Sequence, residues 1–225
     1  INAKDSSNTT GKITSADSHV SANYEIPAST TSAFSNAQSG SYYTNQQVRA
    51  SVDNDYGAYY SYNVATVNTV ASASSGPATY DICPKGWRLP TGGSSGEFQA
   101  LYNKGKSGWT TNNGKNGYWF GGAANAAGAA FFPAAGYVNT SGLANTGSYG
   151  LYWSSTIGSA ASAYILHFHS SGISPADYNG RYNGFSVRCV ADSYAEADTD
   201  VIAIVVPPVI SIDATSGMNK EVDPN

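Results

Sequence analysis

Short aromatic segments alternate with Gly- and Asn-rich turns from Gly117 to Val190, and this alternation limits the ways in which the chain can fold. Aromatic and β-branched segments that are separated by turn residues are typical of antiparallel hairpins. The segments are residues 118–120, 129–132, 136–138, 151–153, 164–169 and 185–190. No pattern of a long helix interrupts them. We therefore predict a fold of short antiparallel strands.

Alternation within two of these segments predicts which side chains share a face. In residues 164–169, Leu166 and Phe168 share one face with Tyr164, and His167 and His169 share the other face with Ile165. In residues 185–190, Phe185, Val187 and Cys189 face together. A cysteine among apolar side chains fits a buried disulfide.

Two short helices are expected upstream of these strands. Residues 56–67 are aromatic and β-branched, which favours a strand that runs into a short helix. Ser94 and Glu97 have capping-box spacing, which indicates a second helix start. The apolar side chains that follow fall at helical spacing and predict a buried helix face at Phe98, Leu101 and Tyr102. The predicted class is α+β.

Residues 92–96 also match Gly-x-Ser-x-Gly, the nucleophile elbow of hydrolases. That motif needs a buried parallel strand directly before it. Residues 88–91 are a poor strand because Pro90 cannot donate a hydrogen bond to a ladder. A hydrolase at Ser94 is therefore an alternative that requires a histidine and an acid within hydrogen-bond reach of Ser94.

The composition narrows the classes of partner. Charged residues make up only 12% of the chain, and 11 basic residues face 15 acidic ones, so the basic surface that nucleic-acid binding requires is missing. The longest apolar run, residues 201–206, is too short to span a membrane. The chain is rich in Tyr and Gly, with 17 and 24 residues, as antibody combining sites are. This composition favours protein or glycan recognition, and it is also typical of a turn-rich secreted β protein.

The chain contains two cysteines, Cys83 and Cys189. With so few Lys and Glu residues, one disulfide in an extracellular protein is expected, and a reduced cytosolic pair is the alternative. We expect one domain over residues 1–192 that begins with an extended segment, residues 1–40. Residues 193–225 are expected to form a linker and a strand that lead to a following module.

Four motifs support a family assignment. They are Cys-Pro-Lys-Gly-Trp-Arg-Leu-Pro-Thr at residues 83–91, Glu-Phe-Gln-Ala-Leu at 97–101, Leu-Tyr-Trp-Ser-Ser-Thr at 151–156 and Gly-Phe-Ser-Val-Arg-Cys-Val at 184–190. Over roughly residues 13–192 the chain resembles the Fibrobacter succinogenes major paralogous domain family. Those bacterial surface domains are thought to share the C-type-lectin-like fold with formylglycine-generating enzymes. The resemblance implies that fold, with long loops and a Cys83–Cys189 disulfide.

Departures from related proteins exclude some activities. The Glu-Pro-Asn, Gln-Pro-Asp and Trp-Asn-Asp motifs of calcium-dependent lectins do not occur, and residues 174–177 offer too few oxygen ligands for calcium. Formylglycine-generating enzymes need two reactive cysteines close together, whereas the partner of Cys189 here is the distant Cys83. We expect no catalysis and no cofactor. His167 and His169 have a metal-ligand spacing, but no third ligand is defined beyond the candidate Asp177, so we assign no metal.

The candidate ligand-binding surface combines two strands and the segment at residues 170–183, which we expect to be a loop. In the C-type-lectin-like fold this loop usually carries the ligand-binding surface. The alternative interpretation is a surface loop with ordinary turn residues. Tyrosine and arginine are enriched at binding hot spots. The candidate residues are Tyr149, Tyr152, His167, His169, Asp177, Tyr178, Arg181 and Tyr182.

The predicted function is binding of a cell-surface protein or glycan by a domain on a bacterial cell or virion surface. The alternative is a structural or tip subunit of a surface filament that assembles through the strand at residues 201–212. The resemblance also suggests the hypothesis that this chain is a variable protein of a diversity-generating retroelement. Residues 165–180 are rich in types reachable from Asn codons by adenine changes. That hypothesis fails if the gene lacks a nearby template repeat and reverse transcriptase.

Overall fold

The computed structural model describes residues 56–67, 75–84, 86–139 and 141–191, together with the backbone of three upstream strands. The upstream strands are β1 (Lys12–Ile13), β2 (Tyr24–Glu25) and β3 (Arg49–Asp53). β1 pairs with β2 in antiparallel orientation, within the extended segment expected over residues 1–40. The rest of the expected segment 1–40, and residues 193–225 with their assembly strand, lie outside the described residues.

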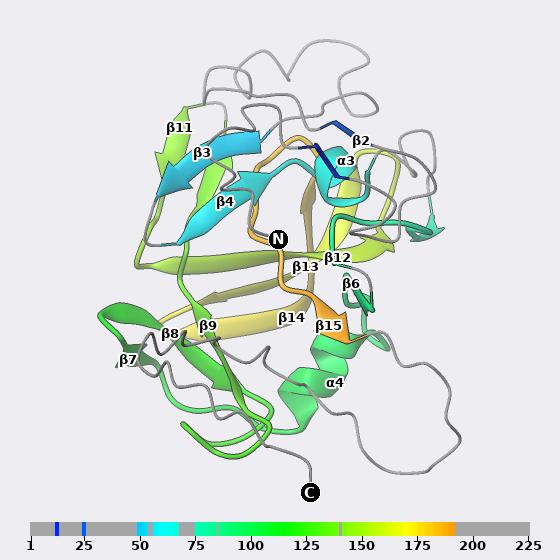
Figure 1. The fold of residues 1–225 in the computed structure, drawn as a ribbon. Helices are drawn as coiled ribbons and strands as arrows, with labels where there is room; N and C mark the ends of the chain where they lie inside the picture. The colour runs from blue at the N-terminus through cyan, green and yellow to red at the C-terminus, as the bar shows by residue number, and fades with distance from the viewer. Residues whose placement is uncertain are drawn as a thin grey trace, which may run out of the picture.

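A four-stranded antiparallel sheet forms the centre of the molecule (Figure 1). Its order is β14-β13-β12-β5, and its strands are β5 (Gly76–Pro77), β12 (Tyr149–Ile157), β13 (Ser162–His169) and β14 (Gly172–Gly180). β14 is an edge strand, and its pairing with β13 shifts register between Ile165 and His167. The strands expected around residues 151–153 and 164–169 are thus confirmed.

The two central strands, β12 and β13, contribute to a core cluster on each face of the sheet, because their side chains alternate between the two faces. The first core cluster takes Trp153 and Ile165 from one face and packs them under Tyr62 and Val64. The second core cluster takes Leu166 and Phe168 from the other face. The predicted division of residues 164–169 between two faces is therefore confirmed.

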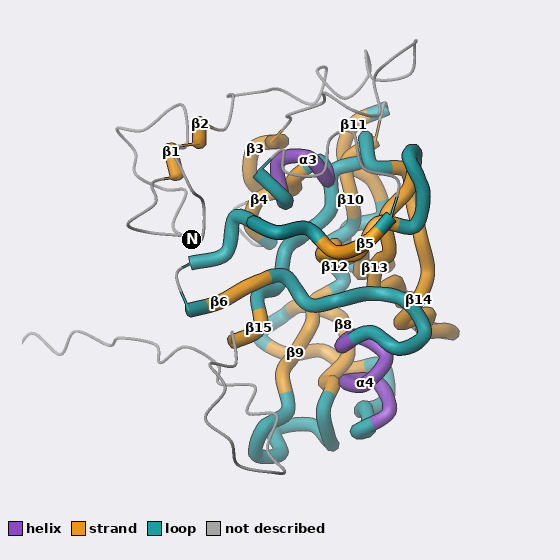
Figure 2. Tube along the Cα trace, turned by 90° about the vertical axis from the view of Figure 1, so that its right-hand side faces the viewer, coloured by secondary structure: helices purple, strands orange, loops and turns teal. Residues whose placement is uncertain are grey.

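The two helices of the described part lie on opposite sides of β12 and β13, as the two views together show (Figures 1 and 2). Helix α3 (Tyr62–Ala65) follows β4 (Gly57–Tyr60), as expected, and belongs to the first core cluster. Helix α4 (Glu97–Asn103) gives Phe98 and Leu101 to the second core cluster.

Shorter strands surround the central sheet. A three-stranded sheet on the second-cluster side contains β7 (Thr110–Asn112), β8 (Lys115–Phe120) and β9 (Ala130–Pro133). The hairpin of β10 (Tyr137–Asn139) and β11 (Gly142–Ala144) is separate, and β6 (Trp87–Arg88) pairs with β15 (Val190–Ala191). Short antiparallel strands and short helices therefore agree with the predicted α+β class. Within the described residues no helix is long and apolar enough to cross a membrane.

Two predicted elements differ from the structure. Residues 170–183 are not a loop, because most of them form β14, which pairs with β13 from Gly172 to Gly180. The last predicted strand, residues 185–190, makes only isolated bridges at Phe185 and Ser186 before β15 begins at Val190. The side chains of this segment still pack as predicted, since Phe185 is buried in the first core cluster and Val187 and Cys189 pack against it.

The start of α4 differs from the predicted capping box. Its N-cap is Gly96, and no side chain caps it there. Glu97 instead accepts two hydrogen bonds from the Arg88 guanidinium, at 2.6 and 2.7 Å, and one from the Thr91 amide at 2.8 Å. The Thr91 hydroxyl accepts the amide of Glu97 in return. Burial alone raises the pKa of the Glu97 carboxyl, but the bonds from Arg88 and Thr91 outweigh it and hold the pKa below its usual value.

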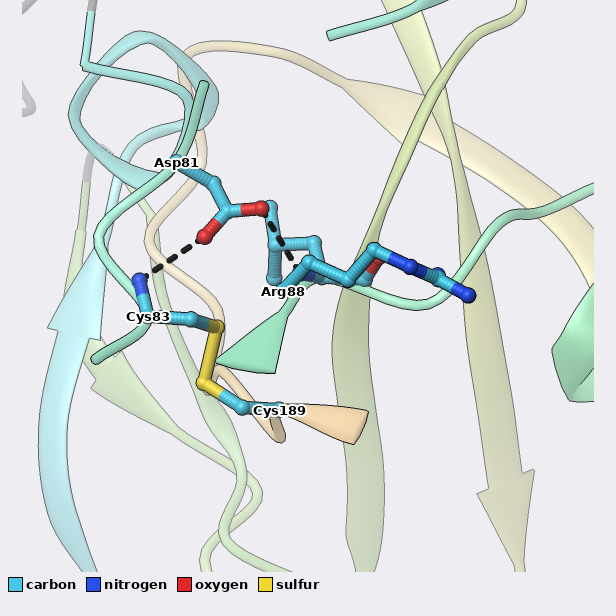
Figure 3. Close-up of a disulfide and its surroundings, with 5 residues drawn as sticks. Asp81, Cys83, Arg88 and Cys189 are labelled. Atoms are coloured by element: carbon cyan, nitrogen blue, oxygen red, sulfur yellow. Dashed lines mark hydrogen bonds between the residues drawn. A yellow bond between two sulfur atoms is a disulfide. The ribbon is translucent and has the colours of Figure 1, made fainter. Parts of the chain in front are cut away.

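The disulfide that the resemblance implied joins Cys83 to Cys189 across 106 residues (Figure 3). Asp81 fixes the turn on the Cys83 side. Its carboxylate accepts the amides of Cys83 at 2.8 Å and of Leu89 at 2.7 Å. The buried carboxylate therefore ties together the residues on either side of β6, and the disulfide joins this segment to the one that leads to β15.

Replacement of both cysteines, Cys83→Ala with Cys189→Ala, is expected to lower the free energy of unfolding by about 2–5 kcal/mol, because the unfolded chain regains the entropy of a long open loop. Urea unfolding of the oxidised wild type and the double variant measures the difference. The matched control is the wild type after reduction and alkylation, whose free energy of unfolding should be lowered by about as much as that of the double variant. Equal stability of all three proteins would contradict a structural role for the bond.

Glu97→Gln is expected to lower the free energy of unfolding by about 1–2 kcal/mol at pH 7, because a neutral amide cannot pair with Arg88. The pKa of Glu97 is lower in the folded than in the unfolded protein. Its contribution is therefore complete above the unfolded pKa of about 4.3 and is lost as the pH falls through the folded pKa. Urea unfolding at neutral and acidic pH should show the two proteins converge in acid. A difference that stays constant with pH would contradict this assignment.

Candidate functional site

Three of the predicted residues form a cluster of rings where the first core cluster ends. Tyr149 on β12 lies opposite His169 on β13, and His167 lies one pair further along the same face, opposite Leu151. The Tyr149 ring is stacked on His167, with centroids 5.6 Å apart and planes 14° apart. It also lies 5.3 Å from His169, and the two imidazoles are 5.8 Å apart. All three side chains are half-buried.

Asp177 extends this cluster from the edge strand. It pairs with Ile165 in the β-ladder, so its side chain lies on the same face as His167. Asp177 Oδ2 is 3.0 Å from His167 Nδ1, and its Oδ1 accepts the amide of Tyr178 at 2.8 Å. The carboxylate therefore holds the His167 ring in place. We call Tyr149, His167, His169 and Asp177 the ring cluster.

The hydrogen bonds of the two histidines define their chemistry. His169 Nδ1 accepts the amide of Ser171 at 3.3 Å, so in the neutral ring the proton lies on Nε2. His167 Nδ1 is hydrogen-bonded to the Asp177 carboxylate. His167 Nε2 is buried and has no hydrogen-bond partner in the described part of the chain. The described residues contain no group of three or more His, Cys, Asp or Glu side chains that could hold a metal ion.

Tyr178 lies apart from the ring cluster. It pairs with Tyr164 in the ladder, on the face opposite to Asp177, and the two tyrosine rings meet at 6.4 Å. With 64% of its surface exposed, Tyr178 is one of two large apolar side chains classed as exposed in the described residues. The sequence did not single out Tyr164, because its partner is fixed by the pairing of β13 with β14.

Tyr152 and Arg181 are corrections to the predicted surface, because both are buried. Tyr152 is 3% exposed, belongs to the second core cluster and donates its hydroxyl to the Pro133 carbonyl at 2.6 Å. Arg181 is 1% exposed, donates to Asn63 Oδ1 at 3.0 Å and lies over the Tyr62 ring. These contacts are internal, so neither side chain belongs to the exposed surface that the sequence predicted.

Tyr182 is half-buried, and its ring lies against Gly180. A Cβ at Gly180 would collide with that ring, which explains the glycine at the end of β14. Tyr182 is therefore placed by the turn after β14 and does not join the ring cluster.

Ser94, the residue of the hydrolase alternative, is exposed in the turn before α4. No strand runs into this turn, since residues 89–93 have no strand structure. Its hydroxyl makes no hydrogen bond to a histidine within the described residues. The geometry that a nucleophile elbow requires is thus missing at this position.

Comparison with known proteins gives one family match. A family model described as Domain of unknown function (DUF8237) matches residues 104–190. The match spans β7 to the first residue of β15 and contains all four residues of the ring cluster. No curated protein and no solved structure matches the chain.

Proposed function

We propose that this chain is an extracellular ligand-binding domain, displayed on a bacterial cell or a virion, that recognises a cell-surface protein or glycan without catalysis. The observation that carries the proposal is the ring cluster, in which Tyr149, His167 and His169 pack together beside the Asp177 carboxylate. The disulfide is compatible with an extracellular location.

The chemistry of the ring cluster suits recognition. Stacked, half-buried rings have already lost much of their side-chain freedom, so a ligand that packs on them costs little further ordering. Beside the rings, His169 Nε2 offers a donor and the Asp177 carboxylate offers acceptor positions. Hydroxyl or amide groups of a ligand can use both while its apolar surface covers the rings.

We also infer a C-type-lectin-like arrangement, as the resemblance implies. Support comes from the Cys83–Cys189 bond and from the pairing of β6 with β15, which together join the segment around residues 83–88 to residues 189–191. Within that arrangement, β13 and β14 carry most of residues 165–180. These are rich in residue types that adenine changes in Asn codons can produce, and a variable protein would diversify them. A template repeat and a reverse transcriptase beside the gene would be the evidence for that role.

Binding of the purified domain to arrayed glycans and to intact bacterial and host cells tests the proposal. His169→Ala and Asp177→Asn are expected to weaken binding by about tenfold or more, because they remove polar contacts at the centre of the surface. A chelator should have no effect. Circular dichroism and melting temperature establish that each variant is folded.

Tyr178→Ala is the matched control, because this exposed tyrosine lies on the opposite face of the same sheet. Its binding should change less than about twofold. If Tyr178→Ala abolishes binding while the ring-cluster variants bind normally, the recognition surface is on the other face. If no protein or glycan binds the folded wild type, the proposal is wrong.

A further inference from the structure

A cavity of about 240 Å³ lies beside β12, and its lining includes Tyr152 of that strand and the disulfide-bonded Cys189. Its apolar wall includes Tyr60, Ile82 and Val187. Its polar lining includes Tyr56, Ser186 and Arg188. None of these lining residues belongs to the ring cluster, so the cavity is a separate site.

Arg188 is the charged group of this cavity. Its guanidinium carbon lies 5.0 Å from the centre of the Phe132 ring, which holds the cation in place. No carboxylate contacts Arg188 within the part of the chain that the structure describes. A guanidinium keeps its charge at all physiological pH values and presents a planar fork of N–H donors that matches a carboxylate. Arg188 therefore combines a fixed position with unused capacity for an anion.

The neighbouring polar groups do not neutralise Arg188. The Tyr152 hydroxyl donates to the Pro133 carbonyl, and burial raises the pKa of Tyr152 although Arg188 opposes that rise, so Tyr152 stays neutral. Ser186 Oγ is buried and has no hydrogen-bond partner in the described part. The cavity thus holds one cation, hydroxyl groups and an apolar wall.

We propose that this cavity binds the carboxylate of a small organic acid, with Arg188 as the anchor and the wall of Tyr60 and Val187 against the attached apolar group. The cavity volume is smaller than that of pockets for drug-sized ligands, which is about 300–1,000 Å³, so a ligand with one ring or a short chain fits. Two sources offer this chemistry: a free acid, and the carboxyl terminus of a peptide.

Titration calorimetry and NMR of the full chain test the proposal with four probes: phenylacetate, phenylacetamide, the peptide Gly-Gly-Phe and its amide. We expect at least one acid to bind with a Kd of about 10 mM or tighter. Its amide should bind about tenfold more weakly or not at all, because it lacks the charge. Shifts should appear at Tyr60 and Val187 and not at His167 or His169. The peptide probes show which source is accepted.

Arg188→Gln should abolish the preference for acid over amide, and Lys104→Gln, which removes an exposed cation outside the cavity, should leave it unchanged. Equal binding of acid and amide to the wild type, or no binding of either acid, overturns the proposal. If Arg188→Gln fails to fold, the wild-type comparison of acid with amide still decides. Loss of glycan or cell binding in the ring-cluster variants would leave this result unaffected.

Discussion

Burial of β12 and β13 on both faces is the constraint on which the rest of this structure depends. Because successive side chains point to opposite faces, a slip of one residue would exchange the two core clusters. Gly150 fixes the register, since the Phe168 ring lies directly over it and any Cβ there would collide with the ring. Trp153 secures the opposite face by donating its indole N–H to the Tyr60 carbonyl at 2.7 Å. Helices α3 and α4 then have one face each to cover.

The ring cluster is a consequence of the same alternation. Leu151 and Ile165 lie on the face of the first core cluster, and the next positions along that face are Tyr149 and His167. There the core ends, so these rings are half-buried and pack on one another. Asp177 reaches them because its ladder partner is Ile165. The proposed binding surface on this face is therefore held by the sheet itself, with no need for a long loop.

The sequence predicted the strands and the faces of β13, because strong period-2 alternation is a local property. It did not predict β14, whose Gly, Ser, Asn and Pro residues favour turns and become a strand only by pairing with β13. The burial of Arg181 depends on Asn63, 118 positions away, and no local signal reports such a partner. Glu97 likewise matched a capping box by spacing, whereas its real partner is Arg88.

The central claim is that one face of the sheet gathers Tyr149, His167, His169 and Asp177 while Tyr178 lies on the other. Nuclear Overhauser effects between assigned ring protons of the oxidised domain test it most directly. The account predicts cross-peaks from Tyr149 to both imidazoles, and from Tyr178 to Tyr164 only. Cross-peaks from Tyr178 to His167, or their absence between Tyr149 and both histidines, would contradict the arrangement on which the proposed function depends.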